Sequence, residues 1–200
     1  HHRVKNNLQT VAALLRLQSR RVGSDEAREA LGEAERRVAT IALVHETLSQ
    51  TLDETVPFDD LIGRSLRLAA DVATQDGAHV RTRVHGSFGL VRAEDATALA
   101  LVLTELVTNA VEHGFSGRAV GTVEITAERA GDLLHVTVAD DGAGVPSEKG
   151  AGSGLGTQIV STLVRNELRG SIAWRPRPGG GTSVELEARL RVNRDAATVA

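Results

Sequence analysis

The sequence predicts an α+β protein in which a helical hairpin precedes an α/β sandwich. Three observations support this prediction. Apolar residues recur at alternating spacings of four and three through about residues 1–50. Beyond them, helical and strand patterns are interleaved to about residue 190. Hydrophobic residues make up 41% of the 200 residues and charged residues 24%, which is typical of a folded chain and excludes wholesale disorder.

The first two elements are expected to be helices. Gly23 ends the first helix, and Ser24 caps the second one. The stripe of the first helix consists of Val4, Leu8, Val11, Leu15, Gln18 and Val22. The stripe of the second consists of Ala27, Leu31, Ala34, Val38, Ile41, His45, Leu48 and Leu52. Two narrow stripes cannot bury a core alone, so we expect a second copy to complete a dimerising four-helix bundle, that is, a homodimer. Packing of the hairpin on the rest of its own chain is the alternative.

The remaining elements follow a break near residues 51–57, which Pro57 marks. We expect helices through residues 61–72, 93–113 and 155–168, and strands at 80–84, 122–128, 133–139, 171–174 and 183–190. This order favours helices on one face of a mixed sheet. The expected domains are residues 1–54 for the hairpin and 55–192 for the sandwich, with a flexible tail at 193–200.

Composition excludes several classes of function. The absence of cysteine rules out disulfides, thiolate catalysis and Cys-bound zinc, and it fits a reducing, cytoplasmic compartment. The net charge of −3 argues against direct nucleic-acid binding over a broad surface. The most apolar stretch, 96–107, is far shorter than the roughly 20 residues that span a bilayer, so we expect no membrane segment. Because the chain begins with His1 rather than Met, we expect a fragment of a longer protein.

The long helix carries the first pattern that could support chemistry. Glu105, Asn109 and His113 are four residues apart and therefore share one helix face. An amide oxygen beside a carboxylate suits Mg²⁺, which takes hard oxygen ligands and keeps several waters. A solvated helix face is the alternative.

The second pattern, Asp140-Asp141-Gly142-Ala143-Gly144, directly follows a strand. A carboxylate at a strand end can accept a hydrogen bond from an exocyclic amine, and the glycines let the backbone approach a ligand. An ordinary acidic turn is the alternative.

The third pattern is a glycine-rich loop that leads into a helix, Gly150-Ala-Gly152-Ser-Gly154-Leu155-Gly156. Such a loop offers free N–H groups and a helix N-terminus to phosphates. Its spacing matches neither a Walker loop nor a Rossmann turn. A mobile linker is the alternative.

Together these patterns resemble the N, G1 and G2 boxes of the GHKL, or Bergerat, ATP-binding fold. The N-terminal His2-Arg3-Val4-Lys5-Asn6-Asn7-Leu8-Gln9 is similar to the phosphoacceptor box of sensor histidine kinases of the HisKA second type, the sister group of the HWE kinases. The segment 37–46 also looks like that family. The resemblance covers about residues 1–190 in the right order.

The resemblance implies ATP and Mg²⁺ as cofactors. It makes His2 the phosphoacceptor, Asn109 a Mg²⁺ ligand, and Glu105 the N-box partner of Asn109. Asp140 would bind the adenine amino group. The implied nucleotide pocket and lid comprise Asn109, His113, Asp140, Gly142, Gly144, Gly152, Gly154, Leu155, Gly156 and Thr182. From helical spacing we add two hypotheses: Lys5 or Arg3 steadies the transferred phosphoryl group, and Asn6 orients a water for dephosphorylation.

The leading interpretation is therefore a two-component sensor histidine kinase core. It would phosphorylate itself on His2 and pass the phosphoryl group to an Asp of a response-regulator receiver domain. The arginine-rich sequence fits a GC-rich actinobacterial genome, where similar kinases serve regulators with an RNA-binding antiterminator output. An anti-sigma-type serine protein kinase and a non-catalytic, nucleotide-binding dimeric scaffold are the alternatives.

Overall fold

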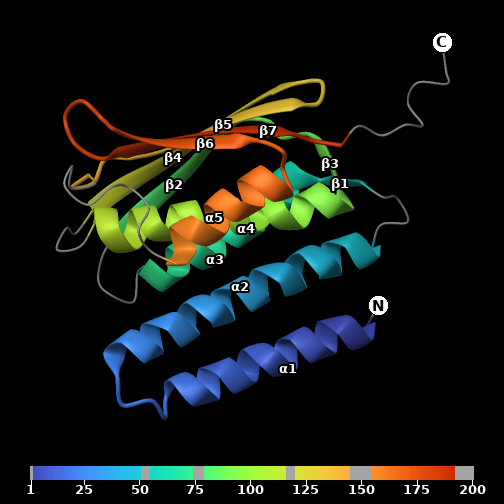
Figure 1. The fold of residues 1–200 in the computed structure, drawn as a ribbon, viewed down its shortest axis with the longest axis vertical. Coiled ribbons are helices and arrows are strands. Elements are labelled where there is room, and N and C mark those ends of the chain that lie inside the picture. The colour runs from blue at the N-terminus through green and yellow to red at the C-terminus, as the bar shows by residue number, and fades with distance from the viewer. Residues whose placement is uncertain (1, 51–54, 74–78, 116–119, 145–154, 192–200) are drawn as a thin grey trace. The chain divides into compact units, whose positions relative to one another are not determined.

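The computed structural model describes residues 2–50, 55–73, 79–115, 120–144 and 155–191. The chain divides into two compact units, His1–Glu54 and Thr55–Ala200. The first unit is a hairpin of α1 (His2–Ser19) and α2 (Asp25–Gln50), drawn in blue in Figure 1. Ser24 caps α2 as expected, because its side-chain oxygen accepts a hydrogen bond from the amide of Ala27 at 3.4 Å. The tail predicted at 193–200 lies outside the described residues.

The hairpin has one covered and one uncovered apolar face on α1. Leu8 and Leu15 are half-buried at heptad spacing, and Val22, just beyond the end of α1, is half-buried too. Val11, which the sequence pattern assigns to the same stripe, is instead 43% exposed, and Leu14 and Leu17 are each 54% exposed. Within one copy the hairpin thus leaves Val11 uncovered, and its predicted place in an apolar stripe closed by a second copy stays a prediction.

The second unit is built on a five-stranded sheet with the strand order β2-β4-β5-β7-β6. Its strands are β2 (His79–Gly86), β4 (Val120–Ala130), β5 (Leu133–Asp140), β6 (Ser171–Pro176) and β7 (Thr182–Arg189). β2 pairs with β4 in parallel, and the other neighbours are antiparallel. The sheet is therefore mixed, as the interleaved sequence pattern predicts.

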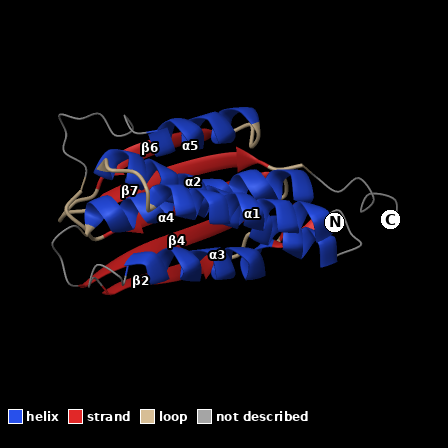
Figure 2. Ribbon diagram, turned by 90° about the horizontal axis from the view of Figure 1, so that it is seen from below, coloured by secondary structure: helices blue, strands red, loops and turns tan. Residues whose placement is uncertain are grey.

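Three helices cover one face of this sheet. They are α3 (Phe58–Ala73), α4 (Ala93–Gly114) and α5 (Leu155–Asn166). Figure 2 shows α5 over β6 and α3 over β2, with α4 between them. The predicted fold class, a helical hairpin followed by an α/β sandwich, is confirmed.

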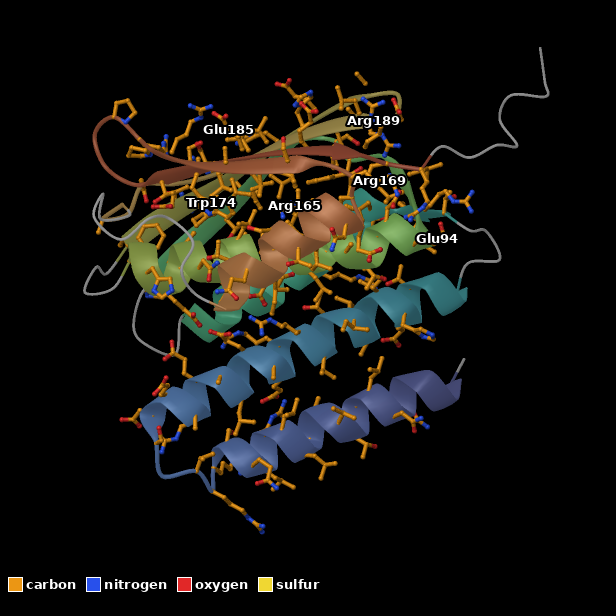
Figure 3. All side chains as sticks on the ribbon, in the orientation of Figure 1. Glu94, Arg165, Arg169, Trp174, Glu185 and Arg189 are labelled. Carbon is orange, nitrogen blue, oxygen red and sulfur yellow. The ribbon has the colours of Figure 1, made fainter. Side chains whose placement is uncertain are left out.

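The core lies between the sheet and these helices because side chains alternate across each strand. On β5, Leu134, Val136 and Val138 are buried against the helical layer, while the residues between them face outward. Figure 3 shows the same alternation at the other edge: Trp174 points toward α5, and Glu185 lies on the outer face of the sheet.

A second, two-stranded sheet is absent from the sequence prediction. It pairs β1 (Thr55–Pro57) with β3 (Leu90–Arg92) in antiparallel register. Asp59 at the start of α3 holds the turn between β2 and β3, since its carboxylate accepts hydrogen bonds from the amides of Phe88 at 2.8 Å and Gly89 at 3.1 Å. The prediction of a simple break near Pro57 is therefore wrong in part, because three-residue strands are too short to show a period.

The end of β7 is tied to the start of α4 by a buried charge. Asp95 is fully buried and accepts hydrogen bonds from the amide of Arg191 at 2.6 Å and from its guanidinium group. Arg169 donates a further bond to Asp95 at 3.3 Å. The carboxylate is thus compensated by charged donors, as a buried charge requires.

Candidate functional site

The polar stripe on α4 runs from the interior of the second unit to its surface. Glu105 is only 8% exposed, Asn109 is half-buried, and His113 is exposed. A stripe on a solvated helix face would expose all three side chains, so that alternative does not describe Glu105. Glu105 and Asn109 lie one turn apart, which places a carboxylate and an amide side by side.

Asp140 is the second polar group at this end of the unit. It is the last residue of β5 and is 4% exposed. Its Oδ1 accepts the amide N–H of Gly142 at 2.9 Å, and its Oδ2 accepts the amide N–H of Thr182 at 3.2 Å. Each oxygen keeps a further lone-pair direction, so the carboxylate can also accept a hydrogen bond from a ligand.

The neighbouring carboxylate has a different role. Asp141 is exposed, and its Oδ1 accepts the amide N–H of Thr122 at 2.8 Å. The amide of Asp141 donates in turn to the carbonyl of Thr122 at 3.3 Å. Asp141 therefore fixes the strand end, which leaves Asp140 as the inward-facing acid of the pair.

Burial sets the electrostatics of Asp140. Desolvation raises the pKa of its carboxyl group above the ordinary value. The hydrogen bonds from Gly142 and Thr182 and the charge of Arg177 lower this pKa, and the charge of Asp141 raises it further. A buried acid near a surface loop, with its pKa pushed upward, is a feature of ligand sites as well as of structural networks.

Three glycines bring separate segments into contact around Asp140. A Cβ atom at Gly142 would lie 2.4 Å from the carbonyl oxygen of Gly114, the last residue of α4. A Cβ atom at Gly181 would lie 2.0 Å from the carbonyl oxygen of Asp140, and Gly181 has a φ of +89°. The amide of Ala143 also donates to the carbonyl of Gly114 at 2.8 Å. Only residues without a side chain permit this approach.

The structure brings part of the predicted site together. The end of α4, the loop after β5 and the β6–β7 hairpin meet at one end of the second unit, in contact at Gly114, Asp140 and Gly181. Thr182 is buried there, and Gly144 has a φ of +81° beside Gly181. The predicted residues Gly152 and Gly154 lie outside the described residues, and Leu155 and Gly156 begin α5. His2, Lys5 and Asn6 lie in the first turns of α1, in the other unit.

One residue of the site has no counterpart in the sequence prediction. Arg177 is half-buried in the β6–β7 hairpin, and its Nη1 donates to the carbonyl oxygen of Asp140 at 2.8 Å. An isolated arginine belongs to no recognisable motif. Only the glycine run at 179–181 hints that the hairpin beside it approaches another segment closely.

Two family models match the chain. One is described as histidine kinase and matches residues 1–71. The other is described as histidine kinase-, DNA gyrase B- and HSP90-like ATPase and matches residues 94–192. The chain belongs to the histidine kinases. The first match covers the hairpin and continues into α3, and the second begins in the first turn of α4; together they confirm the predicted family.

Known histidine kinases resemble the chain over nearly all of its length. It is 52% identical over 191 residues to the sensor histidine kinase PdtaS of Mycolicibacterium smegmatis, and 51% identical to PdtaS of Mycobacterium tuberculosis. Each match covers 93% of this chain but 38% of the relative, so the chain spans well under half the length of these kinases. The histidine kinase domain of a blue-light-activated kinase from Erythrobacter litoralis superposes with a TM-score of 0.72 at 26% identity, covering 94% of this chain and 93% of that one.

These findings establish the enzyme class. The chain carries the core of a two-component sensor histidine kinase, with a catalytic domain of the ATP-binding type. Within the described parts of the chain, no helix is both long and apolar enough to cross a membrane.

Proposed function

We propose that this core transfers the γ-phosphoryl group of ATP to His2 and then to an Asp of a response-regulator receiver domain. The observation that supports the proposal best is the buried carboxylate of Asp140, held between Gly142 and Thr182 where three segments converge. The carboxylate keeps acceptor capacity beyond its two backbone amides, and the 6-amino group of adenine is a donor that would use it.

The donor set on α4 fits Mg²⁺. Asn109 offers an amide oxygen, and Glu105 lies one turn before it as a buried carboxylate. Among the described residues, no three His, Cys, Asp or Glu side chains gather into a metal-binding group. Mg²⁺ suits such a sparse site because it keeps waters and phosphate oxygens as ligands. Asn109 would hold the ion, and the bound ion would neutralise charge on the phosphates.

His2 is the proposed acceptor of the phosphoryl group. A neutral imidazole nitrogen is nucleophilic near pH 7 and attacks the γ-phosphorus in line. The bond to the β–γ bridging oxygen breaks, ADP leaves, and the remaining imidazole proton is released to a base. In the second step a receiver carboxylate attacks the same phosphorus and the N–P bond breaks. Lys5 follows His2 by three residues in the sequence, and we assign it the role of steadying the transferred phosphoryl group.

The assembly proposed for this chemistry is a homodimer. Val11, Leu14 and Leu17 expose an apolar strip on α1, and a second hairpin could cover it in a four-helix bundle. ATP is the phosphoryl donor, so we assign the reaction to the cytoplasm. The similarity to mycobacterial sensor kinases fits an actinobacterial response regulator as the partner. An RNA-binding antiterminator output for that regulator stays a prediction from the family resemblance.

Radiolabelled ATP tests the proposed reaction. We expect label on the chain that is acid-labile and base-stable, as a phosphoimidazole is. The label should be lost in His2→Gln and kept in His1→Gln, a matched neighbour in the sequence. Addition of a receiver domain should then move the label to that protein.

The competing functions predict other results in the same assay. An anti-sigma-type serine kinase would leave acid-stable label on an added protein. A non-catalytic scaffold would bind ATP and transfer nothing. Either result, or retention of the label in His2→Gln, would reject the proposed reaction.

A further inference from the structure

The hairpin between β6 and β7 has a glycine-rich tip and is held against β5 by hydrogen bonds. Its tip contains Gly179, Gly180 and Gly181, whose φ values are +90°, +109° and +89°. Three consecutive glycines lose much conformational entropy when they are ordered, so a loop of this kind needs an anchor. Within the tip, the amide of Arg177 donates to the carbonyl of Gly181 at 3.1 Å, and the amide of Gly180 donates to the carbonyl of Arg177 at 3.2 Å.

The side chain of Arg177 supplies the anchor to the neighbouring segment. Its Nη1 donates to the carbonyl oxygen of Asp140 at 2.8 Å. This contact lies where β5 leaves the ladder, because the last pair between β5 and β7 is Ala139 with Ser183. The arginine thus continues the attachment of the hairpin to β5 beyond the end of the paired strands.

The anchored hairpin carries one of the two donors to the Asp140 carboxylate. Thr182 directly follows the glycine tip, and its amide donates to Oδ2 of Asp140 at 3.2 Å. If the hairpin moved away from Asp140, this hydrogen bond would be lost and the carboxylate would be free to rotate. The other donor, Gly142, belongs to the loop of Asp140 itself and would remain.

Arg177 also contributes a positive charge beside a buried acid. The groups that face the carboxyl group of Asp140 are Arg177 from the hairpin and Asp141 from its own loop, and Gly114 of α4 packs against it. Arg177 counteracts both the burial and the charge of Asp141, which raise the pKa of Asp140. The ionised carboxylate only accepts hydrogen bonds, and it accepts one from an amino group more strongly than the protonated form does.

We propose that Arg177 is a positioning residue for nucleotide recognition, which locks the β6–β7 hairpin onto Asp140 so that the carboxylate faces the 6-amino group of the purine. The inference rests on the proposed role of Asp140 toward adenine. It assigns to Arg177 no contact with the nucleotide. Arg177 acts through Asp140 alone, and its effect depends on whether the base carries an amino group.

Equilibrium binding of two nucleotides tests this inference. ADP carries the 6-amino group, and purine riboside diphosphate carries hydrogen in its place; neither can donate a γ-phosphoryl group. We expect Arg177→Met to weaken ADP binding by about tenfold, the usual effect of a lost hydrogen bond to a charged group. Binding of the analogue should change by less than about twofold, because it makes no use of that bond. Equal losses for both nucleotides, or an undiminished preference for ADP, would overturn the inference.

Arg175→Met is the matched control. Arg175 lies two residues earlier, on β6, and its Nε donates to Glu185 at 3.0 Å on the outer face of the sheet, where Figure 3 labels Glu185. This variant should keep the affinities of the unmodified chain for both nucleotides. A loss of the ADP preference in Arg175→Met would show that the effect is not specific to Arg177.

Two further results separate the possible failures. If the unmodified chain binds ADP and the analogue equally, the proposed role of Asp140 fails before Arg177 is considered. If Arg177→Met does not fold, Arg177→Lys replaces it, because lysine keeps the charge but not the planar fork. Its preference for ADP should lie between that of the unmodified chain and none, and an unchanged preference would overturn the inference.

Discussion

The carbonyl oxygen of Gly114 lies 2.4 Å from the point that a Cβ atom on Gly142 would occupy. The end of α4 and the loop after β5 therefore touch through their main chains. No side-chain rearrangement can relieve a clash between backbone atoms, so the whole contact depends on glycine at position 142.

Gly142→Ala is accordingly expected to destabilise the catalytic unit by about 2 kcal/mol or more and to abolish ATP binding. Urea denaturation and a nucleotide-binding titration measure the two effects. Gly32→Ala is the control, because this glycine lies inside α2 with only Arg36 near its Cβ direction. Alanine there should raise stability by up to about 1 kcal/mol. Similar effects of the two substitutions would contradict the role of the contact.

The affinity for ATP should fall at acidic pH because of Asp140. Burial raises the pKa of its carboxyl group in the folded chain above the ordinary value of 3.8. As pH falls through this raised pKa, the carboxylate becomes protonated and loses the negative charge that strengthens its hydrogen bond from the adenine amino group. ATP affinity should therefore fall on acidification, beginning above the pH expected for an ordinary aspartate, and Asp140→Asn should bind weakly without this pH dependence.

The same pKa shift acts on folding with the opposite sign. Since the folded-state pKa of Asp140 is the higher one, protonation favours the folded state. This contribution is fully present below the unfolded-state pKa and is lost as pH rises through the folded-state pKa. Relative to Asp140→Asn, the unmodified chain should thus lose stability as pH rises through that window, as measured by urea denaturation. A constant difference between the two across the window would refute the shift.

Asp95 is expected to matter for stability and not for nucleotide affinity. Asp95→Ala leaves Arg169 and Arg191 without their buried partner and should cost about 3–5 kcal/mol. Glu94→Ala is a close control, since Glu94 also pairs with Arg191, at 3.3 Å, but is exposed, and its loss should cost at most about 1 kcal/mol. Thermal unfolding compares the two variants. ATP affinity of the folded fraction should be unchanged in both.

Asn6 is proposed to act in the hydrolysis of phosphorylated His2. It follows His2 by one helical turn and is exposed. Asn6→Ala should slow the hydrolysis of phosphorylated His2, because Asn6 is assigned to orient the attacking water. The rate of autophosphorylation should be largely unchanged. Asn7→Ala, one residue further round the helix, should leave both rates unaltered. Decay of acid-labile label gives the answer, and unchanged dephosphorylation in Asn6→Ala would reject the assignment.

The exposed strip on α1 predicts the oligomeric state. A double variant, Leu14→Glu with Leu17→Glu, should convert a dimer into a monomer, because it places two charges in the proposed interface. Val120→Glu alters a comparably exposed apolar residue in the other unit and should leave the dimer intact. Sedimentation velocity measures the mass. If the unmodified chain sediments as a monomer, the proposed four-helix bundle is wrong.

Periodic features could be predicted from the sequence, and contacts between distant segments could not. The apolar spacing located α1 and α2, and Ser24 caps α2 as expected. The short strands β1 and β3 escaped prediction because three residues carry no period. At the site, spacing placed Glu105 and Asn109 on one face, but it could not show that Gly114 meets Asp140. The role of Arg177 could not be predicted from the sequence, because its hydrogen-bond partner is a main-chain carbonyl 37 residues away.

The assembly of the Asp140 carboxylate site from α4, β5 and the start of β7 has a consequence for biosynthesis. Thr182, which supplies one of its hydrogen bonds, lies close to the end of the sandwich. Because the chain is synthesised from its N-terminus, Thr182 is added after α4 and the loop that follows β5. The hydrogen bonds around the Asp140 carboxylate, and with them the adenine site proposed above, are therefore complete only after β7 has emerged.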